Sequence, residues 1–175
     1  MDNLTSTINI TQASLSDAEA ITRVNILAWQ QSYRGMISDE YLNTISFEDL
    51  LSFRKKILTT PAEKSIHLIA TVNDEVIGYS DAGSCRDATH SGEIYSLYLL
   101  EQYKHHGIGS MLFERVHDHL VKHSLTPYIA WVLKENQIAR RFYEKWGGEL
   151  FQELMVDIGG REYLEVGYVF SRVIG

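Results

Sequence analysis

The stretch EIYSLYLLEQYKHHGIGSMLF, residues 93–113, decides the fold of this chain. It reads as a short apolar strand, a polar turn, and two glycines, Gly107 and Gly109, that open a helix. A helix start leaves backbone N–H groups without partners and carries the positive end of the helix dipole, and a glycine lets an anion approach the main chain without a Cβ in the way. The segment therefore predicts a site for a phosphorylated ligand.

Two common phosphate-binding motifs do not fit this turn. A dinucleotide-binding loop needs a third glycine three residues after Gly109, where Leu112 stands, and a nucleoside triphosphate loop needs Gly-Lys-Ser/Thr, which is absent. On this segment alone, a turn that uses glycine only for its backbone is an equally good interpretation.

On both sides of this stretch, the hydrophobic periodicity of the sequence predicts further strands and helices. Asn73-Asp74 predicts a hairpin turn, Ser16 with Glu19 predicts a capping box at the first helix, and Gly147-Gly148 ends the last helix. Strands are expected at 7–11, 66–72, 76–82, 94–100, 128–133, 150–157 and 163–170, and helices at 17–31, from 38, at 47–58, 108–123 and 136–146. The helix from Ile108 carries an apolar stripe of Ile108, Leu112, Val116 and Leu120 with Met111 beside it, and the last carries Ile138, Ala139, Phe142 and Trp146 on one face. A mixed α/β sheet covered by helices follows, in one domain spanning 1–175.

Composition and charge exclude several classes of protein. The chain has 175 residues, 45% of them hydrophobic, and a formal net charge of −7, which argues against nucleic acid or an anionic membrane as the main partner. No segment is long and apolar enough to span a bilayer. The start lacks the features of a secretory signal, and the single cysteine, Cys85, suits a reducing compartment, so we expect a cytoplasmic protein.

A second segment, WVLKENQIARRFYEKWGG at 131–148, adds a strand, a helix cap at Asn136, a helix and a glycine stop. Taken with residues 93–112, it resembles the GNAT superfamily of N-acetyltransferases, whose acetyl-coenzyme A motif is a strand, a Gln/Arg-x-x-Gly-x-Gly/Ala turn and a helix. The resemblance extends more loosely to 76–79 and 29–42. The first motif position is Lys104, which keeps the positive charge but presents a point donor in place of a planar fork.

The resemblance implies a mixed, mostly antiparallel sheet of about seven strands that splays between 94–100 and 128–133 to admit acetyl-coenzyme A. It places a strand bulge at 97–99, with Leu99 as the main-chain donor to the thioester oxygen. Lysines and arginines beside the two segments would supply local positive charge. The implied cofactor-binding residues are Leu97, Tyr98, Leu99, Lys104, His105, His106, Gly107, Ile108, Gly109, Ser110, Asn136, Ala139, Arg140 and Tyr143.

The implied reaction moves an acetyl group to a primary amine by direct attack in a ternary complex. Tyr143 matches the family's tyrosine acid near the sulfur. Because a phenol has a pKa of ~10 and a thiol ~8.5, full proton transfer is uphill by about 2 kcal/mol, so we expect hydrogen bonding with late protonation. Glu93 is the leading base, with an ordinary strand-end charge as an equal alternative; Asp81, Asp87 and His90 could do the same work.

The acceptor side is less determined. Tyr33 and Arg34 are expected to hold the acceptor, Trp29 is expected in the core, and the acidic balance weakly favours a cationic amine. Small amines, antibiotics, peptide N-termini and lysine all stay open. His119 and His123 lie one turn apart without a metalloprotease glutamate, so no metal is expected.

Two functions other than acetyl transfer are also compatible with the sequence. A non-catalytic acyl-coenzyme A sensor on the same fold would bind the ligand without turnover, and an interaction domain would not bind it. The resemblance also allows a homodimer.

Overall fold

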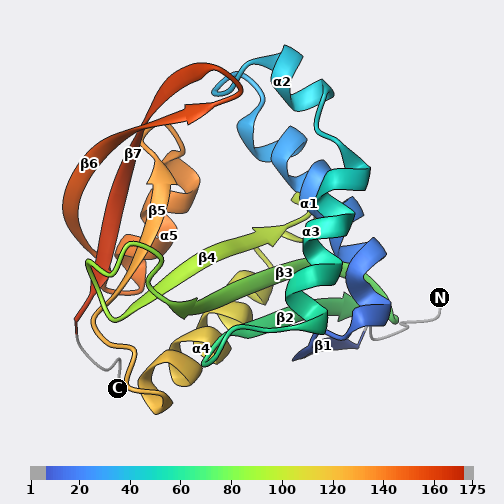
Figure 1. Ribbon diagram of the computed structural model, residues 1–175, viewed down its shortest axis with the longest axis horizontal. Helices are drawn as coiled ribbons and strands as arrows, with labels where there is room; N and C mark the ends of the chain where they lie inside the picture. The colour runs from blue at the N-terminus through green and yellow to red at the C-terminus, as the bar shows by residue number, and fades with distance from the viewer. Residues whose placement is uncertain (1–6, 172–175) are drawn as a thin grey trace.

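In the computed structural model, which describes residues 7–171, seven strands form one sheet in the order β1-β2-β3-β4-β5-β7-β6 (Figure 1). The strands are β1 (Ile8–Gln12), β2 (Ile66–Val72), β3 (Glu75–Ser84), β4 (Gly92–Leu99), β5 (Tyr128–Leu133), β6 (Glu149–Ile158) and β7 (Arg161–Phe170). The helices are α1 (Ala18–Tyr33), α2 (Asp39–Asn43), α3 (Phe47–Thr59), α4 (Ile108–Lys122) and α5 (Gln137–Lys145), with short 3-10 turns at Leu15–Asp17 and Glu101–Tyr103. All strand pairs are antiparallel except β4 with β5, so the predicted mixed sheet is confirmed.

Helices cover both faces of the sheet (Figure 1). The stripe predicted on α4 is fully buried, with Ile108, Leu112, Val116 and Leu120 each at most 1% exposed. Met111 is 37% exposed, so its predicted burial is wrong; it lies about 100° around the helix from Leu112. Against the opposite face, α1 contributes Ile21 and Val24 to a second core cluster.

The parallel strands β4 and β5 stay together for only three residue pairs, from Gly92–Tyr128 to Ile94–Ala130, and then part, which is the predicted splay. The bulge in β4 falls at Tyr95, because Asp81 pairs with Ser96 while Ala82 pairs with Ile94. The predicted position of the bulge, at 97–99, is therefore wrong. The ring of Tyr95 fits over Gly83, where an added Cβ would lie 2.7 Å from the phenol oxygen, and that hydroxyl donates to the carbonyl of Ser84.

The first helix also starts differently from the prediction. The capping box is formed by Ser14 and Asp17 around the 3-10 turn, in place of Ser16 and Glu19, and Asp17 Oδ2 accepts from both the amide and the hydroxyl of Ser14. Ser14–Asp17 and Ser16–Glu19 have the same spacing, and the glutamate of the second pair fits the capping-box pattern, so the pattern favoured the wrong pair. The Asn73-Asp74 hairpin turn is confirmed, with both residues at positive φ.

The closing hairpin of β6 and β7 is attached to α2, and its tip lies beside that helix in Figure 1. Gly159 lies against Tyr41 so closely that an added Cβ would come within 2.2 Å of the ring. Tyr163 accepts a hydrogen bond from the amide of Ser38 at 3.0 Å. Among residues 7–171, none of the helices has the length and hydropathy needed to cross a membrane. The N-terminal segment considered for a secretory signal lies mostly outside the described residues.

Candidate active site

A cleft of about 660 Å³ opens where β4 and β5 part. Its walls include most of the predicted site residues: Tyr33, Arg34, Leu97, Tyr98, Leu99, Lys104, His105, Gly107, Gly109, Ser110, Asn136, Ala139 and Tyr143. His106, Ile108, Arg140 and Glu93 are not among its walls. The sequence reasoning missed Trp131, Ile138, Phe142 and Lys145, which also line it. Ile138, predicted on the apolar face of the last helix, is 58% exposed and lines this cleft.

The β4 side of the cleft offers main-chain groups. Leu100 donates its amide to the carbonyl of Ile77 on β3 at 3.0 Å. Because successive residues of a strand alternate their hydrogen-bonding direction, the main-chain groups of Leu97 and Leu99 point to the other edge, toward β5. The pairing with β5 has already ended at Ile94. This edge can therefore pair with an extended ligand.

The start of α4 supplies a second set of main-chain donors. Gly107 is the N-cap at φ +81°, and no side chain of the described residues caps this helix, whereas α2, α3 and α5 are capped by Ser38, Ser46 and Asn136. The first helical amide bonded to the helix's own carbonyls is that of Met111, which donates to Gly107. The amides of 108–110 are thus left for an anion.

The two glycines of the turn have different roles. Gly107 is required by its positive φ, and an added Cβ there would meet nothing within 4 Å. At Gly109 an added Cβ would lie 3.6 Å from Phe142, an ordinary contact. The expectation that Gly109 keeps a Cβ away from an anion stays a prediction; its Cα side faces Phe142 of α5, which lines the same cleft.

The cationic side chains near the cleft are largely held by the protein. Lys104 Nζ contacts Glu101 and lies 3.3 Å from Ser32 Oγ. Arg140, expected to face the ligand, donates to the hydroxyl of Tyr168 at 3.0 Å and to the carbonyl of Lys134 at 3.1 Å. It thus lies against β7, because Tyr168 projects from β7 toward α5. Lys145 lines the cleft instead.

Tyr143 is positioned by α5, whose cap is confirmed: Asn136 Oδ1 accepts from the amide of Ala139 at 3.1 Å. The Tyr143 side chain packs near Phe113, Tyr168 and Phe170, and the residue is 7% exposed. Burial raises the pKa of its phenol well above the usual value. It is therefore a neutral hydrogen-bond donor at the wall of the cleft.

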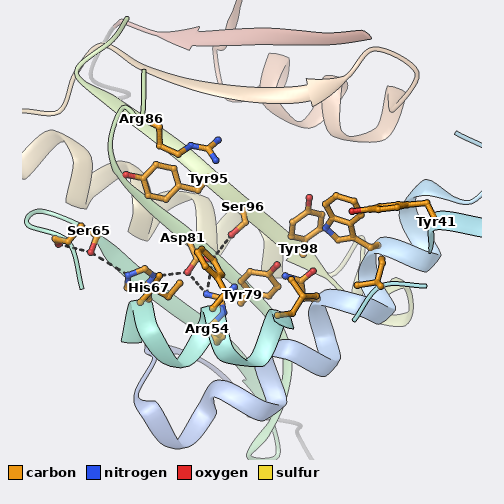
Figure 2. A pocket seen from close by; sticks show the side chains of 17 residues that line it. Tyr41, Arg54, Ser65, His67, Tyr79, Asp81, Arg86, Tyr95, Ser96 and Tyr98 are labelled. Carbon is orange, nitrogen blue, oxygen red and sulfur yellow. Dashed lines mark hydrogen bonds and ion pairs between the residues drawn. The ribbon is translucent and has the colours of Figure 1, made fainter. Parts of the chain in front are cut away.

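Asp81, considered as an alternative base, is committed to a buried network (Figure 2). Its carboxylate accepts two bonds from Arg54 Nη1, at 2.8 and 2.9 Å, one from His67 Nδ1 at 2.7 Å and one from Ser96 Oγ at 2.6 Å. Burial alone raises the pKa of this carboxyl, but the bond from His67 and the charge of Arg54 outweigh it, and the pKa lies below its usual value. Asp81 is thus an ionised partner of Arg54.

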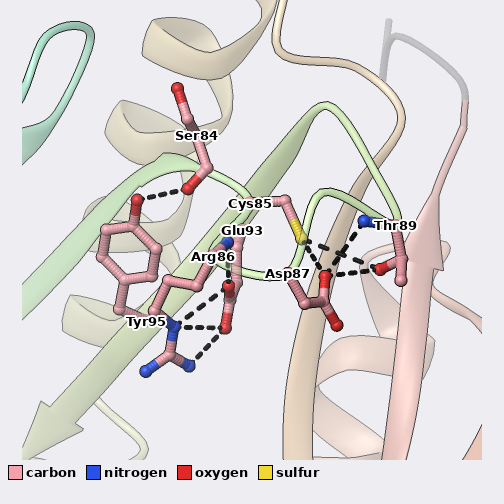
Figure 3. Close-up of polar contacts among 7 residues, drawn as sticks. All are labelled: Ser84, Cys85, Arg86, Asp87, Thr89, Glu93 and Tyr95. Atoms are coloured by element: carbon pink, nitrogen blue, oxygen red, sulfur yellow. Dashed lines mark hydrogen bonds and ion pairs between the residues drawn. The ribbon is translucent and has the colours of Figure 1, made fainter.

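Glu93, the leading candidate base, is 3% exposed at the start of β4. Figure 3 shows that Arg86 holds both of its oxygens, through Nε at 3.0 and 3.1 Å, through Nη2, and through the backbone amide at 3.1 Å. In the same loop, the Cys85 thiol donates to Asp87. The role of Glu93 as base stays a prediction, and its full pairing with Arg86 disfavours it.

Glu165 on β7 is a carboxylate that the sequence reasoning did not consider; like Glu93, it is not among the walls of the cleft. It has the parity of Tyr163, whose hydroxyl meets α2, so both side chains point to the α1 and α2 side of the sheet. Burial raises its pKa, with Arg86 opposing and Glu93 adding to the shift; burial also raises the pKa of Tyr33, and the charge of Glu165 adds to that shift. Among residues 7–171 no hydrogen bond or ion pair to this carboxylate is found. No local motif marks Glu165. The sequence offered one indication, which is that Glu165 lies two residues after Tyr163 on a predicted strand and so faces the same side of the sheet.

At the same side, the hydroxyls of Tyr33 and Tyr98 lie 3.0 Å apart and hydrogen bond to each other. Trp29 packs edge-on against Tyr33, with ring centroids 5.0 Å apart, and is partly buried. Arg34 forms an exposed ion pair with Asp39 at 3.5 Å. Tyr33 is therefore at the junction of α1 and β4, and Arg34 is at the rim.

Comparisons with known proteins agree with this geometry. The family model described as acetyltransferase (GNAT) family matches residues 25–148. The chain is 25% identical over 162 residues to an uncharacterized N-acetyltransferase, YuaI, of Bacillus subtilis (strain 168), covering 91% of each chain, and 25% identical over 146 residues to the spermidine N(1)-acetyltransferase of Thermoplasma acidophilum, covering 80% of this chain and 87% of that one. Its fold is similar to the crystal structure of PaiA N-acetyltransferase from Thermoplasma acidophilum in complex with coenzyme A, with a TM-score of 0.70 and 22% identity over 94% of this chain and 99% of that chain.

Proposed function

The chain belongs to the GNAT family of acetyltransferases and is an acetyl-coenzyme A-dependent acetyltransferase, and we propose that it transfers the acetyl group directly to a primary amine within a ternary complex. The observation that carries this proposal is the pair of open main-chain edges in one cleft, at the start of α4 and along β4. The relative that is a spermidine N(1)-acetyltransferase supports an amine acceptor.

The donor fits these residues. The amides of 108–110 and the turn from His105 would hold the diphosphate, with the helix dipole favouring its negative charge. The open edge of β4 at Leu97 and Leu99 would pair with the amide groups of the pantetheine arm, as a neighbouring strand does. Both sets of donors are main-chain groups, so the absence of a Gln or Arg at Lys104 does not remove them.

In the reaction, the neutral amine nitrogen forms a bond to the thioester carbonyl carbon, and the carbon–sulfur bond breaks. The amine loses a proton and the sulfur leaves as a thiolate that finally gains one. Tyr143 would donate a hydrogen bond to that sulfur; because its pKa is raised, it would stay protonated until the negative charge develops.

The proton from the amine would pass to a carboxylate on the acceptor side. Glu165 is favoured over Glu93 for this role, because its carboxylate is unpaired among the described residues, whereas Arg86 holds both oxygens of Glu93. The conversion of the ammonium to the amine could then occur beside Tyr33.

Two assays on the wild-type protein test the proposal. A thermal shift with coenzyme A should show stabilisation, about 2.7 kcal/mol at a ligand concentration 100 times Kd. A panel of primary amines with acetyl-coenzyme A should release free thiol. Stabilisation without thiol release from any amine would support the acyl-coenzyme A sensor, and no stabilisation at saturation would contradict both.

A further inference from the structure

A second cavity, of about 410 Å³, lies between α3 and the face of β2, β3 and β4 (Figure 2). Small-molecule sites in proteins fall in the range of roughly 300–1,000 Å³. Its walls include a group of aromatic rings drawn from α1, α2, α3, β3 and β4: Trp29, Tyr41, Phe53, Tyr79, Tyr95 and Tyr98. Such rings favour an aromatic occupant through edge-on and offset stacking.

The charges in this cavity are already paired. Asp81 is the carboxylate among its described walls, and Arg54, His67 and Ser96 occupy it (Figure 2). Two guanidinium groups, of Arg54 and Arg86, also line the cavity. Both are ion-paired, with Asp81 and Glu93 respectively, so a polyamine would find no unpaired carboxylate among the described walls to hold its ammonium groups, which disfavours its binding.

The cavity and the cleft meet at one segment of β4. Tyr95, Ser96 and Tyr98 line both spaces, and the Tyr98 hydroxyl is hydrogen bonded to Tyr33 in the wall of the cleft. An occupant of the cavity would thus lie next to the strand whose main chain faces the acetyl donor.

We propose that this cavity receives the body of the acceptor, and that the acceptor is a primary monoamine carried on an aromatic ring. The inference rests on the proposed function and adds the acceptor class to it. The ring would lie among the aromatic side chains beneath α3, and the amino group would point toward Ser96 and Tyr98, at the junction with the cleft.

The first test compares acceptors on the wild-type protein. With acetyl-coenzyme A at saturation, kcat/KM measured by thiol release should be at least tenfold higher for 2-phenylethylamine and tryptamine than for n-butylamine or spermidine. A preference for spermidine or n-butylamine, or equal values for all four, would overturn the inference while leaving acetyl transfer intact.

The second test blocks the rim. Ala62 is exposed and lines the cavity, while its neighbour Glu63 is exposed and is not among the walls. Ala62→Trp should raise the Kd of 2-phenylethylamine about tenfold in calorimetry without any acyl donor, with Glu63→Trp as the matched control that leaves it unchanged. In both variants the Kd of coenzyme A should equal that of the wild type.

These readouts separate the two proposals. No thermal stabilisation by coenzyme A contradicts the proposed function. Stabilisation by coenzyme A together with no measurable binding of 2-phenylethylamine, or with equal binding to Ala62→Trp and Glu63→Trp, contradicts the acceptor class alone.

Discussion

The cleft between β4 and β5 and the cavity beneath α3 are built from different parts of the chain. The cleft offers main-chain groups of two adjacent segments, the edge of β4 and the uncapped start of α4. The cavity is made of side chains from elements far apart in sequence, over a buried network centred on Asp81. A site of main-chain groups tolerates side-chain substitution, whereas a site of paired side chains does not.

The largest effect should come from breaking the network. Asp81→Asn leaves the buried Arg54 without its charge partner, so the free energy of unfolding should fall by about 3–5 kcal/mol in urea denaturation. In the wild type, the folded pKa of Asp81 lies below the unfolded value of ~3.9. Its contribution is therefore full above that value and is lost as the pH falls through the folded pKa. Asp87→Asn, at an exposed loop carboxylate, is the control; equal losses in the two variants would contradict this role.

The next effect tests chemistry on the acceptor side. Glu165→Gln should lower kcat/KM about 100-fold, equivalent to about 2.7 kcal/mol, because the base is lost. In the wild type, kcat/KM should rise with pH as Glu165 deprotonates, with a midpoint above the usual glutamate pKa because that pKa is raised. This limb should vanish in the variant. If Glu93→Gln removes the limb and Glu165→Gln does not, the assignment is reversed.

A smaller effect is expected at Tyr143 in the wall of the cleft, the proposed donor to the coenzyme sulfur. Tyr143→Phe removes one donor hydroxyl and little volume, so kcat should fall about 10- to 30-fold, or roughly 1.4–2 kcal/mol. The Kd of coenzyme A by calorimetry should change less than about threefold. An unchanged kcat would exclude Tyr143 as the donor, and Tyr103→Phe, outside the cleft walls, serves as a matched control.

The smallest effects separate main chain from side chain within the cleft. Gly107→Ala forces a Cβ onto a residue at φ +81° and should cost about 1 kcal/mol of stability. Coenzyme A binding should weaken, because relief of that strain would move the turn that presents the amides of 108–110. Lys104→Ala should weaken coenzyme A binding by less than about threefold, since its ammonium already contacts Glu101 and Ser32. A larger loss in Lys104→Ala than in Gly107→Ala would contradict a main-chain site.

The order of elements was predictable because it depends on local patterns. The apolar, β-branched run of 66–72, the turn at Asn73-Asp74 and the α4 stripe of Ile108 and Leu112 each specify their element within a few residues. Where two local signals of the same spacing competed, as for the capping boxes at Ser14 and Ser16, the sequence pattern favoured Ser16 and the structure forms the box at Ser14. The bulge at Tyr95 was missed for a related reason: it depends on Gly83, on the neighbouring strand.

The amino-acid sequence by itself determined the sheet, the crossover from β4 through α4 to β5, and the open amides at Gly107, since these follow from hydrogen bonding and hydrophobic periodicity among neighbours in the chain. Only the tertiary structure decided that Glu93 is held by Arg86, that Arg140 faces Tyr168, and that Glu165 is left unpaired among the described residues. Which charged side chains pair depends on how strands and helices far apart in the sequence pack together, and no local sequence pattern encodes that packing.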